Sequence, residues 1–185
     1  MTQTISIISY ASINTALGLI FVATVDEKIY NVQFADNEKA ALEELQSYMT
    51  KHSSAVELQK ARKNNKLLQQ SLALLKDYLD SPSVAVYKQL QALPLFIQGT
   101  EFQKKVWKEL MKIPMGQTMS YTEIAHQIGA PKSTRAVANA CAVNRHGIIV
   151  PCHRVLRSDG GISGYRWGVA REKQLIAMEA ENKDL

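Results

Sequence analysis

An aliphatic run at residues 148–150, followed by Pro151, Cys152 and His153, constrains this chain more than any other segment. β-Branched residues cut off by proline predict a short buried strand that presents the next side chains in a fixed direction. The first of these is a thiol, whose reactive form is the thiolate, and an imidazole follows it. Cys152 is therefore a candidate nucleophile, with a buried packing cysteine as the alternative on this segment alone.

The composition fits an ordinary globular protein. With 185 residues, 46% hydrophobic and 21% charged, the chain can form one domain or two small ones. Two cysteines without a CxxC pair argue against a disulfide framework and a zinc finger, so we expect no bound metal. No apolar stretch reaches the roughly 18 residues of a membrane helix, and no signal peptide is recognisable. We expect a cytoplasmic protein with no membrane partner.

The net positive charge lies in the second half of the chain. Residues 1–90 carry nine basic and nine acidic side chains, whereas residues 91–185 carry thirteen and eight, which accounts for the net charge of +5. A polyanion such as a nucleic acid would bind to this half of the chain. A basic surface by itself, however, can serve only to keep a protein soluble.

The pattern of the first half predicts a small sheet followed by helices. Short β-rich runs at residues 5–10, 19–25 and 29–34 predict strands, with a turn at residues 26–28 between the last two. Residues 37–49 and about 55–79 predict helices, and leucines at three- and four-residue spacing in the second helix indicate core packing. A Ser-Pro-Ser sequence then ends the pattern, which places a domain boundary between residues 85 and 90.

The second half predicts a helix-turn-helix. Capping boxes at residues 100–103 and 120–123 each begin a helix, and the second helix closes at Gly129. Residues 132–143 form the next helix, whose many small side chains would let it approach DNA closely. Helix corners of this kind also occur in proteins that touch no DNA.

The composition of that last helix points to one task in particular. Lys132 and Arg135 occupy its first turn, and Arg135 and Asn139 are the main candidates to contact base edges. Sequence-specific reading would need more such side chains. A lone Arg135 on a small-residue helix instead suits insertion into the base stack, where it fills the space left by an extruded nucleotide.

A longer pattern runs through the second half. It consists of Gly99-Thr100, Phe102-Gln103, Val106-Trp107, Ile113-Pro114, Gly116, Ser120-Tyr121, Ile124-Ala125, Ile128-Gly129, Pro131, Arg135-Ala136-Val137, Asn144, Ile149-Val150-Pro151-Cys152-His153-Arg154-Val155, Gly164-Tyr165 and Glu179. Together these residues closely resemble the O6-alkylguanine-DNA alkyltransferases, the methylated-DNA-protein-cysteine methyltransferases, over about residues 95–180. Residues 164–169 are most similar to the carboxy-terminal half of bacterial adaptive-response proteins. Their amino-terminal four-cysteine zinc module is not in this chain, so we expect a stand-alone repair protein.

The resemblance implies both a fold and a reaction. The fold is α+β, with a small ribonuclease-H-like domain at residues 1–90 and a helical, DNA-binding alkyltransferase domain at residues 91–185. In the reaction, an O6-alkylguanine, or an O4-alkylthymine, is flipped out of duplex DNA. Cys152 then displaces the alkyl group in one irreversible step, so each protein acts once, as a monomer and without a cofactor.

The resemblance also assigns catalytic roles. His153 takes the proton of Cys152 through a water, and Glu179 orients and balances the imidazole as in a triad. Asn144 ties the turn after the recognition helix to Cys152, besides the C-cap use that its position favours. Tyr121 donates a proton or hydrogen bond to the departing guanine.

The position of Glu179 supports its role independently. It follows Leu175 and Ile176 by four and three residues on the last predicted helix, so its carboxylate shares their buried face. An unpaired carboxylate there would be costly, which calls for a partner such as His153. If this pair holds Cys152 as a thiolate, the pKa of Cys152 should lie below that of a free thiol.

Further contacts follow from the resemblance alone. The substrate pocket would contain Tyr121, Val155, Tyr165 and Arg166. DNA contacts would come from Arg135, Lys132, Thr122 and Ser158.

Some positions depart from the family pattern. Ala138-Asn139 replaces a Gly-rich pair, which alters how closely the helix can enter a groove. Arg166-Trp167 replaces a Ser-Gly pair, so we expect a narrower pocket that accepts bulky O6 adducts poorly. Glu172 occupies a position where most relatives have a lysine, so the resemblance assigns it no function. Cys141 matches no nucleophile position and is interpreted as packing.

Three other classes of function stay open on the sequence. A cysteine hydrolase would use the same Cys152, His153 and Glu179, but it needs an oxyanion hole that the sequence does not supply. A noncatalytic lesion-binding protein would keep Tyr121 and Arg135 but lose the nucleophile. A transcriptional regulator would need the missing regulatory module.

Overall fold

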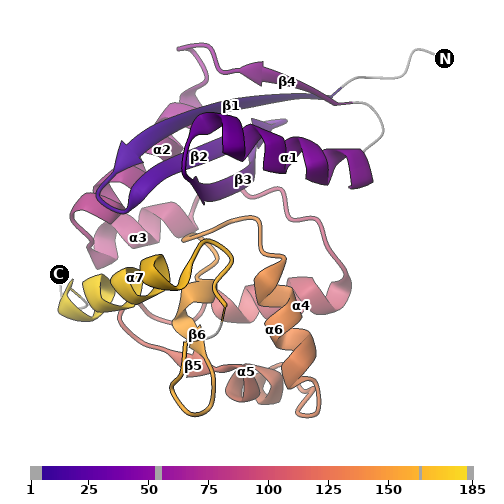
Figure 1. Ribbon diagram of the computed structural model, residues 1–185, viewed down its shortest axis with the longest axis vertical. Coiled ribbons are helices and arrows are strands. Elements are labelled where there is room, and N and C mark those ends of the chain that lie inside the picture. Colours follow the sequence, from indigo (N-terminus) through magenta and orange to yellow (C-terminus); the bar gives the residue numbers. More distant parts are fainter. Residues whose placement is uncertain (1–5, 53–55, 163, 183–185) are drawn as a thin grey trace.

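The structure is a computed structural model that describes residues 6–52, 56–162 and 164–182, and it has a mixed α+β fold (Figure 1). Its elements in chain order are β1 (Ser6–Thr15), β2 (Gly18–Val25), β3 (Lys28–Ala35), α1 (Glu38–His52), β4 (Val56–Lys60), α2 (Lys66–Asp80), α3 (Val84–Gln91), α4 (Glu101–Leu110), β5 (Met119–Ser120), α5 (Tyr121–Gln127), α6 (Thr134–Ala142), the 3-10 turn η1 (Cys152–Arg154), β6 (Val155–Leu156) and α7 (Val169–Asn182). The sheet and the short helices of the second half form two layers, with α7 and α3 between them in Figure 1. No helix in the described ranges is long and apolar enough to cross a membrane.

The first half is a four-stranded sheet in the order β3-β2-β1-β4. Strand β2 pairs antiparallel with both β1 and β3, whereas β4 pairs parallel with β1. Side chains alternate across the sheet, so Phe21 and Ala23 of β2 pack with α1 while Ile20 and Val22 pack with α2. The central strand β2 is therefore covered on both faces, which explains its nearly continuous hydrophobic sequence.

The three strands predicted from the sequence are confirmed, apart from residue 5, which lies outside the described residues. Asp26 and Glu27 have positive φ angles of 46° and 56°, the geometry of a two-residue hairpin turn. The predicted helix at 55–79 is wrong over its first part, and residue 55 itself is not described. Val56–Lys60 forms β4, because its backbone groups pair with the free edge of β1, and α2 begins only at Lys66.

Helix α2 joins the two halves of the molecule. Its leucine stripe is confirmed as core, with Leu68, Leu72, Leu75 and Leu79 buried. These side chains belong to one hydrophobic cluster that extends from β2 and β3 through α4, α5 and α6 to α7. Because both halves share this core, movement of the sheet relative to the second half would expose apolar surface.

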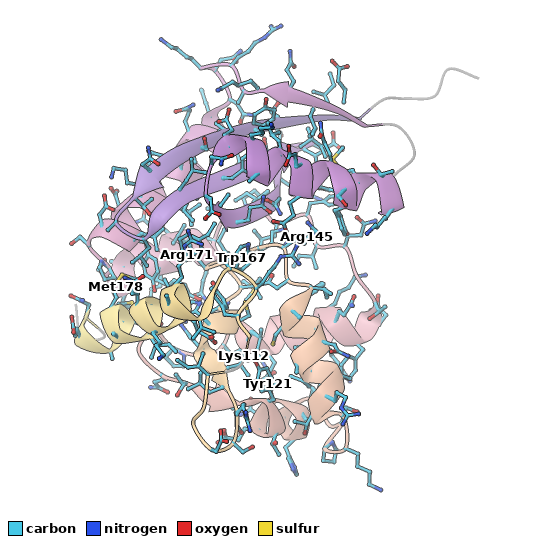
Figure 2. All side chains as sticks on the ribbon, viewed as in Figure 1. Lys112, Tyr121, Arg145, Trp167, Arg171 and Met178 are labelled. Carbon is cyan, nitrogen blue, oxygen red and sulfur yellow. The ribbon has the colours of Figure 1, made fainter. Side chains whose placement is uncertain are left out.

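Charged and aromatic side chains also fill the junction between the two layers, where Figure 2 shows Arg145, Trp167 and Arg171. The guanidinium of Arg145 lies 3.4 Å from the ring centre of Tyr48 on α1, and that of Arg171 lies 5.3 Å from the ring centre of Phe34 on β3. Arg171 also donates to the carbonyl oxygen of Trp167. The loop before α7 is thereby attached to the sheet.

The helix starts predicted at the two capping boxes are confirmed, whereas the third helix begins at Thr134 and not at Lys132, which precedes its first turn. Both capping boxes form, one before α4 and one before α5. Helix α5 ends at Gln127, and Gly129, two residues later, has a φ of 74° that turns the chain toward α6. Helix α6 lies within the predicted range 132–143, and the indole of Trp107 on α4 donates to the carbonyl of Ala140 at 2.9 Å. This bond fixes α6 against the core.

The predicted strand at residues 148–150 is wrong. The segment is buried as expected, but it forms tight turns in which Val150 N–H donates to His146 O and Cys152 N–H donates to Val150 O. Ile148 has a φ of 71°, a strained conformation for a β-branched residue. The sequence pattern predicted the burial of this segment correctly. Within the described residues, however, no strand pairs its backbone with residues 148–150.

Candidate active site

Cys152 opens η1 and lines a pocket of about 250 Å³. The pocket lies between α5, α6 and the loop that leads into α7. Its walls are Tyr121, Ala138, Asn139, Cys141, Ala142, Cys152, Gly164, Tyr165, Arg166 and Glu172. The site therefore places the buried thiol of Cys152 beside the last turns of α6.

Asn144 connects the end of α6 to the thiol. Its side-chain amide donates to Val150 O at 2.9 Å and to Cys152 Sγ at 3.3 Å, while its Oδ1 accepts from the N–H of His146 at 2.9 Å. All three hydrogen bonds are buried, so they fix the turn of residues 144–152. The structure thus brings together two residues that the sequence placed in one site.

Glu179 of α7 is the centre of a buried charge network. His153 Nε2 lies 2.7 Å from Glu179 Oε1, and Arg154 donates to both carboxylate oxygens at 2.8 and 3.0 Å. Tyr78 of α2 donates a further hydrogen bond to Oε1 at 2.5 Å. Burial alone would raise the pKa of Glu179, but the hydrogen bonds from His153 and Arg154, with the positive charge of Arg154, hold it well below its usual range. The expected burial of Glu179 beside Leu175 is confirmed.

This network sets the tautomer of His153. A carboxylate accepts but cannot donate, so the hydrogen of the neutral imidazole resides on Nε2 and the lone pair on Nδ1. Nδ1 is buried and has no hydrogen-bond partner within the described residues. It is therefore a base that a water could link to the thiol.

The expectation of a resting thiolate is wrong. Burial raises the pKa of Cys152 to about 11, although the hydrogen bond from Asn144 acts in the opposite direction. The folded protein at neutral pH therefore holds a protonated thiol. A nucleophile of this kind is activated during the reaction, when a base removes its proton, and is protected from stray electrophiles at rest.

Not all of the predicted substrate residues lie in the wall of the pocket. Tyr121 and Tyr165 both line the pocket, and the buried hydroxyl of Tyr165 has no hydrogen-bond partner in the described part of the chain. The ring of Tyr165 stands edge-on to that of His153, with ring centres 6.4 Å apart. Val155 is fully buried in the core outside this lining, so only its main chain could reach a substrate.

Arg166 lines the pocket, and its guanidinium is bound to groups at the edge of α6 and on α1. It donates to Ala142 O at 3.1 Å and pairs with Glu44 of α1. The first half of the chain thereby holds the loop before α7. With Trp167 buried behind it, this arrangement leaves a small pocket.

The predicted DNA contacts lie on the outside of the helix-turn-helix. Lys132 and Arg135 are exposed at the start of α6. Thr122 Oγ1 of α5 lies 3.2 Å from Ser158 Oγ, so these two hydroxyls form one patch. Figure 2 shows Tyr121 in the same layer, near α5. Lys132 and Arg135 are thus accessible at the surface of the second half.

Sequence reasoning missed three residues of the site. Arg154 belongs to the sequence motif, but no role was predicted for it. In the structure its guanidinium pairs with the carboxylate of Glu179. Tyr78 comes from a helix 101 residues earlier and sits among the leucines of α2, so no local pattern could have indicated it. Glu172 was given no function, yet its buried carboxyl faces the pocket.

Known proteins were compared with this chain. Residues 101–181 match the family described as 6-O-methylguanine DNA methyltransferase, DNA binding domain. The chain is 40% identical over 177 residues to the Escherichia coli bifunctional transcriptional activator/DNA repair enzyme Ada, a match that covers 96% of this chain and 47% of that protein. The chain thus spans about half the length of that relative.

Two further comparisons extend over most of both chains. The structure superposes on the crystal structure of Mycobacterium tuberculosis OGT in complex with DNA with a TM-score of 0.71 and 28% identity, covering 94% of this chain and 93% of that one. A methylated-DNA–protein-cysteine methyltransferase of Saccharomyces cerevisiae is 33% identical over 165 residues, which cover 84% of this chain and 85% of that protein. On these matches, the chain belongs to the methylated-DNA–protein-cysteine methyltransferase family.

Proposed function

We propose that this protein repairs DNA by direct damage reversal, accepting the alkyl group of O6-alkylguanine, and of O4-alkylthymine, on Cys152. The observation that carries the proposal is the buried thiol of Cys152, held by Asn144 beside the His153–Glu179 pair at the base of a pocket. Family membership and the DNA-bound structure of the Mycobacterium tuberculosis relative support it.

The reaction is an in-line displacement at the alkyl carbon. The Cys152 sulfur forms a bond to that carbon as the bond from carbon to O6 breaks, and the bonding electron pair leaves with the guanine. The thiol proton passes through a water to His153 Nδ1, whose positive charge Glu179 balances. Tyr121 donates a hydrogen bond or proton to the departing base. The product thioether is stable, so the protein is spent after one transfer.

DNA is held by the face that carries the helix-turn-helix. Lys132, Thr122 and Ser158 contact the phosphate backbone, while Arg135 fills the stack from which the damaged nucleotide is flipped. Tyr165 and the main chain at Val155 and Arg166 bind the base. The pocket of about 250 Å³ suits small alkyl groups. The partner is alkylated duplex DNA, no cofactor takes part, and the protein acts as a cytoplasmic monomer.

The same proposal includes the organisation of the chain. Residues 1–90 form a ribonuclease-H-like domain, and residues 91–185 form the DNA-binding alkyltransferase domain. The ion pair between Arg166 and Glu44, together with the hydrogen bond from Tyr78 to Glu179, gives the first domain a direct role in shaping the site of the second.

Stoichiometry tests the proposed function. Incubation of the protein with an excess of O6-methylguanine duplex should yield unmodified guanine that stops at one equivalent per protein. The reason is that Cys152 is consumed by the reaction that it performs. Repeated turnover would point instead to a hydrolase that uses the same residues.

The role of Arg135 can be separated from that of Lys132. Arg135→Ala should slow repair of duplex DNA much more than reaction with free O6-alkylguanine base, because a free base has no stack to leave. Lys132→Ala should weaken duplex binding and reduce its salt dependence, because a phosphate contact acts through counterion release. Single-turnover rates on duplex and free base at two salt concentrations measure both effects. Equal slowing of both substrates by Arg135→Ala would assign that arginine to support of the pocket.

A further inference from the structure

Glu172 is a buried carboxyl in the wall of the Cys152 pocket. It lies in the first turn of α7, is 1% exposed, and lines the same pocket as the thiol. Its Oε2 has no hydrogen-bond partner within the described residues. A buried acidic group without a partner is costly and rare, so it calls for a functional reason.

The pocket places several titratable or charged groups around this carboxyl. They are Tyr121 of α5, Cys141 of α6, Cys152 of η1, and Tyr165 and Arg166 of the loop before α7. Arg166 is the cation of this set, and its guanidinium is already bound to Ala142 O and Glu44.

The neighbours of Glu172 on its own helix do not neutralise it either. Arg171 donates to Leu17 O and Trp167 O, and Lys173 is exposed. No ion pair found among the described residues includes Glu172. The carboxyl therefore faces a nucleophilic thiol with no cation bound to it.

This environment gives the pocket two charge states near neutral pH. Burial raises the pKa of Glu172 to about 7. In its ionised form the carboxylate in turn raises the pKa of Cys152, because a negative charge nearby disfavours a second one on sulfur. Ionisation of the two groups is coupled, and each opposes the other.

We propose that Glu172 is a positioning residue that controls Cys152 through its charge, permitting thiolate formation when neutral and opposing it when ionised. The proposal rests on the proposed alkyl transfer for its biological meaning, since a thiol that can be used only once must not react before it meets a lesion. In the empty pocket the ionised carboxylate adds to the effect of burial, and both oppose loss of the thiol proton. A flipped base that displaces water from the pocket favours the neutral carboxyl and removes this opposition.

Thiol reactivity tests the proposal without DNA. The rate of Cys152 alkylation by iodoacetamide, followed by peptide mass spectrometry, should be measured from pH 6 to 11. Glu172→Gln should move the reactive range to lower pH. At pH 8 to 9 the rate should rise roughly three- to fourfold for each unit by which the pKa of Cys152 falls, since a more acidic thiol is also less nucleophilic. Near pH 6, where Glu172 is neutral in the wild type, both proteins should react at similar rates.

Two matched variants complete the experiment. Glu172→Asp keeps a carboxyl at this position and should retain the opposition to thiolate formation that Glu172→Gln loses. Glu181→Gln removes an exposed carboxyl from the same helix and should leave the pH profile unchanged. A Glu172→Gln profile that matches the wild type, or an equal shift in Glu181→Gln, would overturn the proposal.

A measurement on the wild-type protein keeps the test decisive if Glu172→Gln does not fold. The side-chain carboxyl carbon of Glu172, observed by ¹³C NMR, should titrate near neutral pH. Titration in the ordinary range of a glutamate, near about 4.3, would overturn the proposal. Neither measurement requires methyl transfer, so failure of the protein to repair O6-methylguanine would contradict the proposed function and leave this inference standing.

Discussion

Replacing Cys152 with alanine should abolish methyl transfer while DNA binding is retained. The sulfur forms the new bond to the alkyl carbon. Burial raises the pKa of the second pocket thiol, Cys141, as well, but Cys141 is followed by Ala142 and not by an imidazole that could take its proton. Lys132 and Arg135, the side chains proposed to bind DNA, are exposed at the surface and do not line the pocket of Cys152. Transfer of a radioactive methyl group and duplex binding by fluorescence anisotropy measure the two properties.

Cys141→Ala is the matched control for that experiment. It removes the other free cysteine of the same pocket and should leave the extent of transfer unchanged. Residual transfer in Cys152→Ala, or its loss in Cys141→Ala with the fold intact, would mean that the nucleophile is misassigned.

Glu179→Gln should cause the largest loss of stability. The substitution leaves the guanidinium of Arg154, which is fully buried, without its charge partner. Breaking a buried ion pair in this way costs about 3–5 kcal/mol in the free energy of unfolding. The His153 ring also loses the carboxylate that holds hydrogen on Nε2, so transfer should slow at temperatures where the variant is still folded. Urea unfolding and single-turnover transfer measure the two effects.

The pH dependence of this loss follows from the direction of the Glu179 pKa. Because the folded protein holds this pKa below its usual range, the carboxylate contributes stability that is fully present above the unfolded value of about 4.3. That contribution declines as the pH falls toward the folded pKa. The difference between wild type and Glu179→Gln should therefore be constant near neutral pH and shrink below about pH 4. Glu181→Gln, exposed on the same helix, should stay within about 0.5 kcal/mol of the wild type.

The sequence predicted those parts of the fold that local chemistry determines. Capping boxes before α4 and α5 and the turn at Asp26 and Glu27 depend on a few adjacent residues, and all were recognisable. Spacing alone also placed Glu179 on the buried face of α7. These features need no knowledge of the rest of the chain.

The features that the sequence did not predict depend on distant partners. Val56–Lys60 became a strand because the edge of β1 was free to pair with it. Strand β3 bridges His146, just before the segment at 148–150, but no strand among the described residues pairs with that segment itself. Tyr78 reaches Glu179 across the shared core, which no periodicity encodes. The protonated state of Cys152 reflects total burial, which the motif around it does not reveal.

Intact-mass spectrometry after incubation with O6-methylguanine duplex tests the central claim most directly. The protein should gain the mass of a single CH₂ unit, because a methyl group replaces the thiol hydrogen. Peptide mapping should place the methyl group on Cys152, with no further gain when the DNA is in excess. An unchanged mass despite repair of the guanine, or a methyl group on Cys141, would contradict the account.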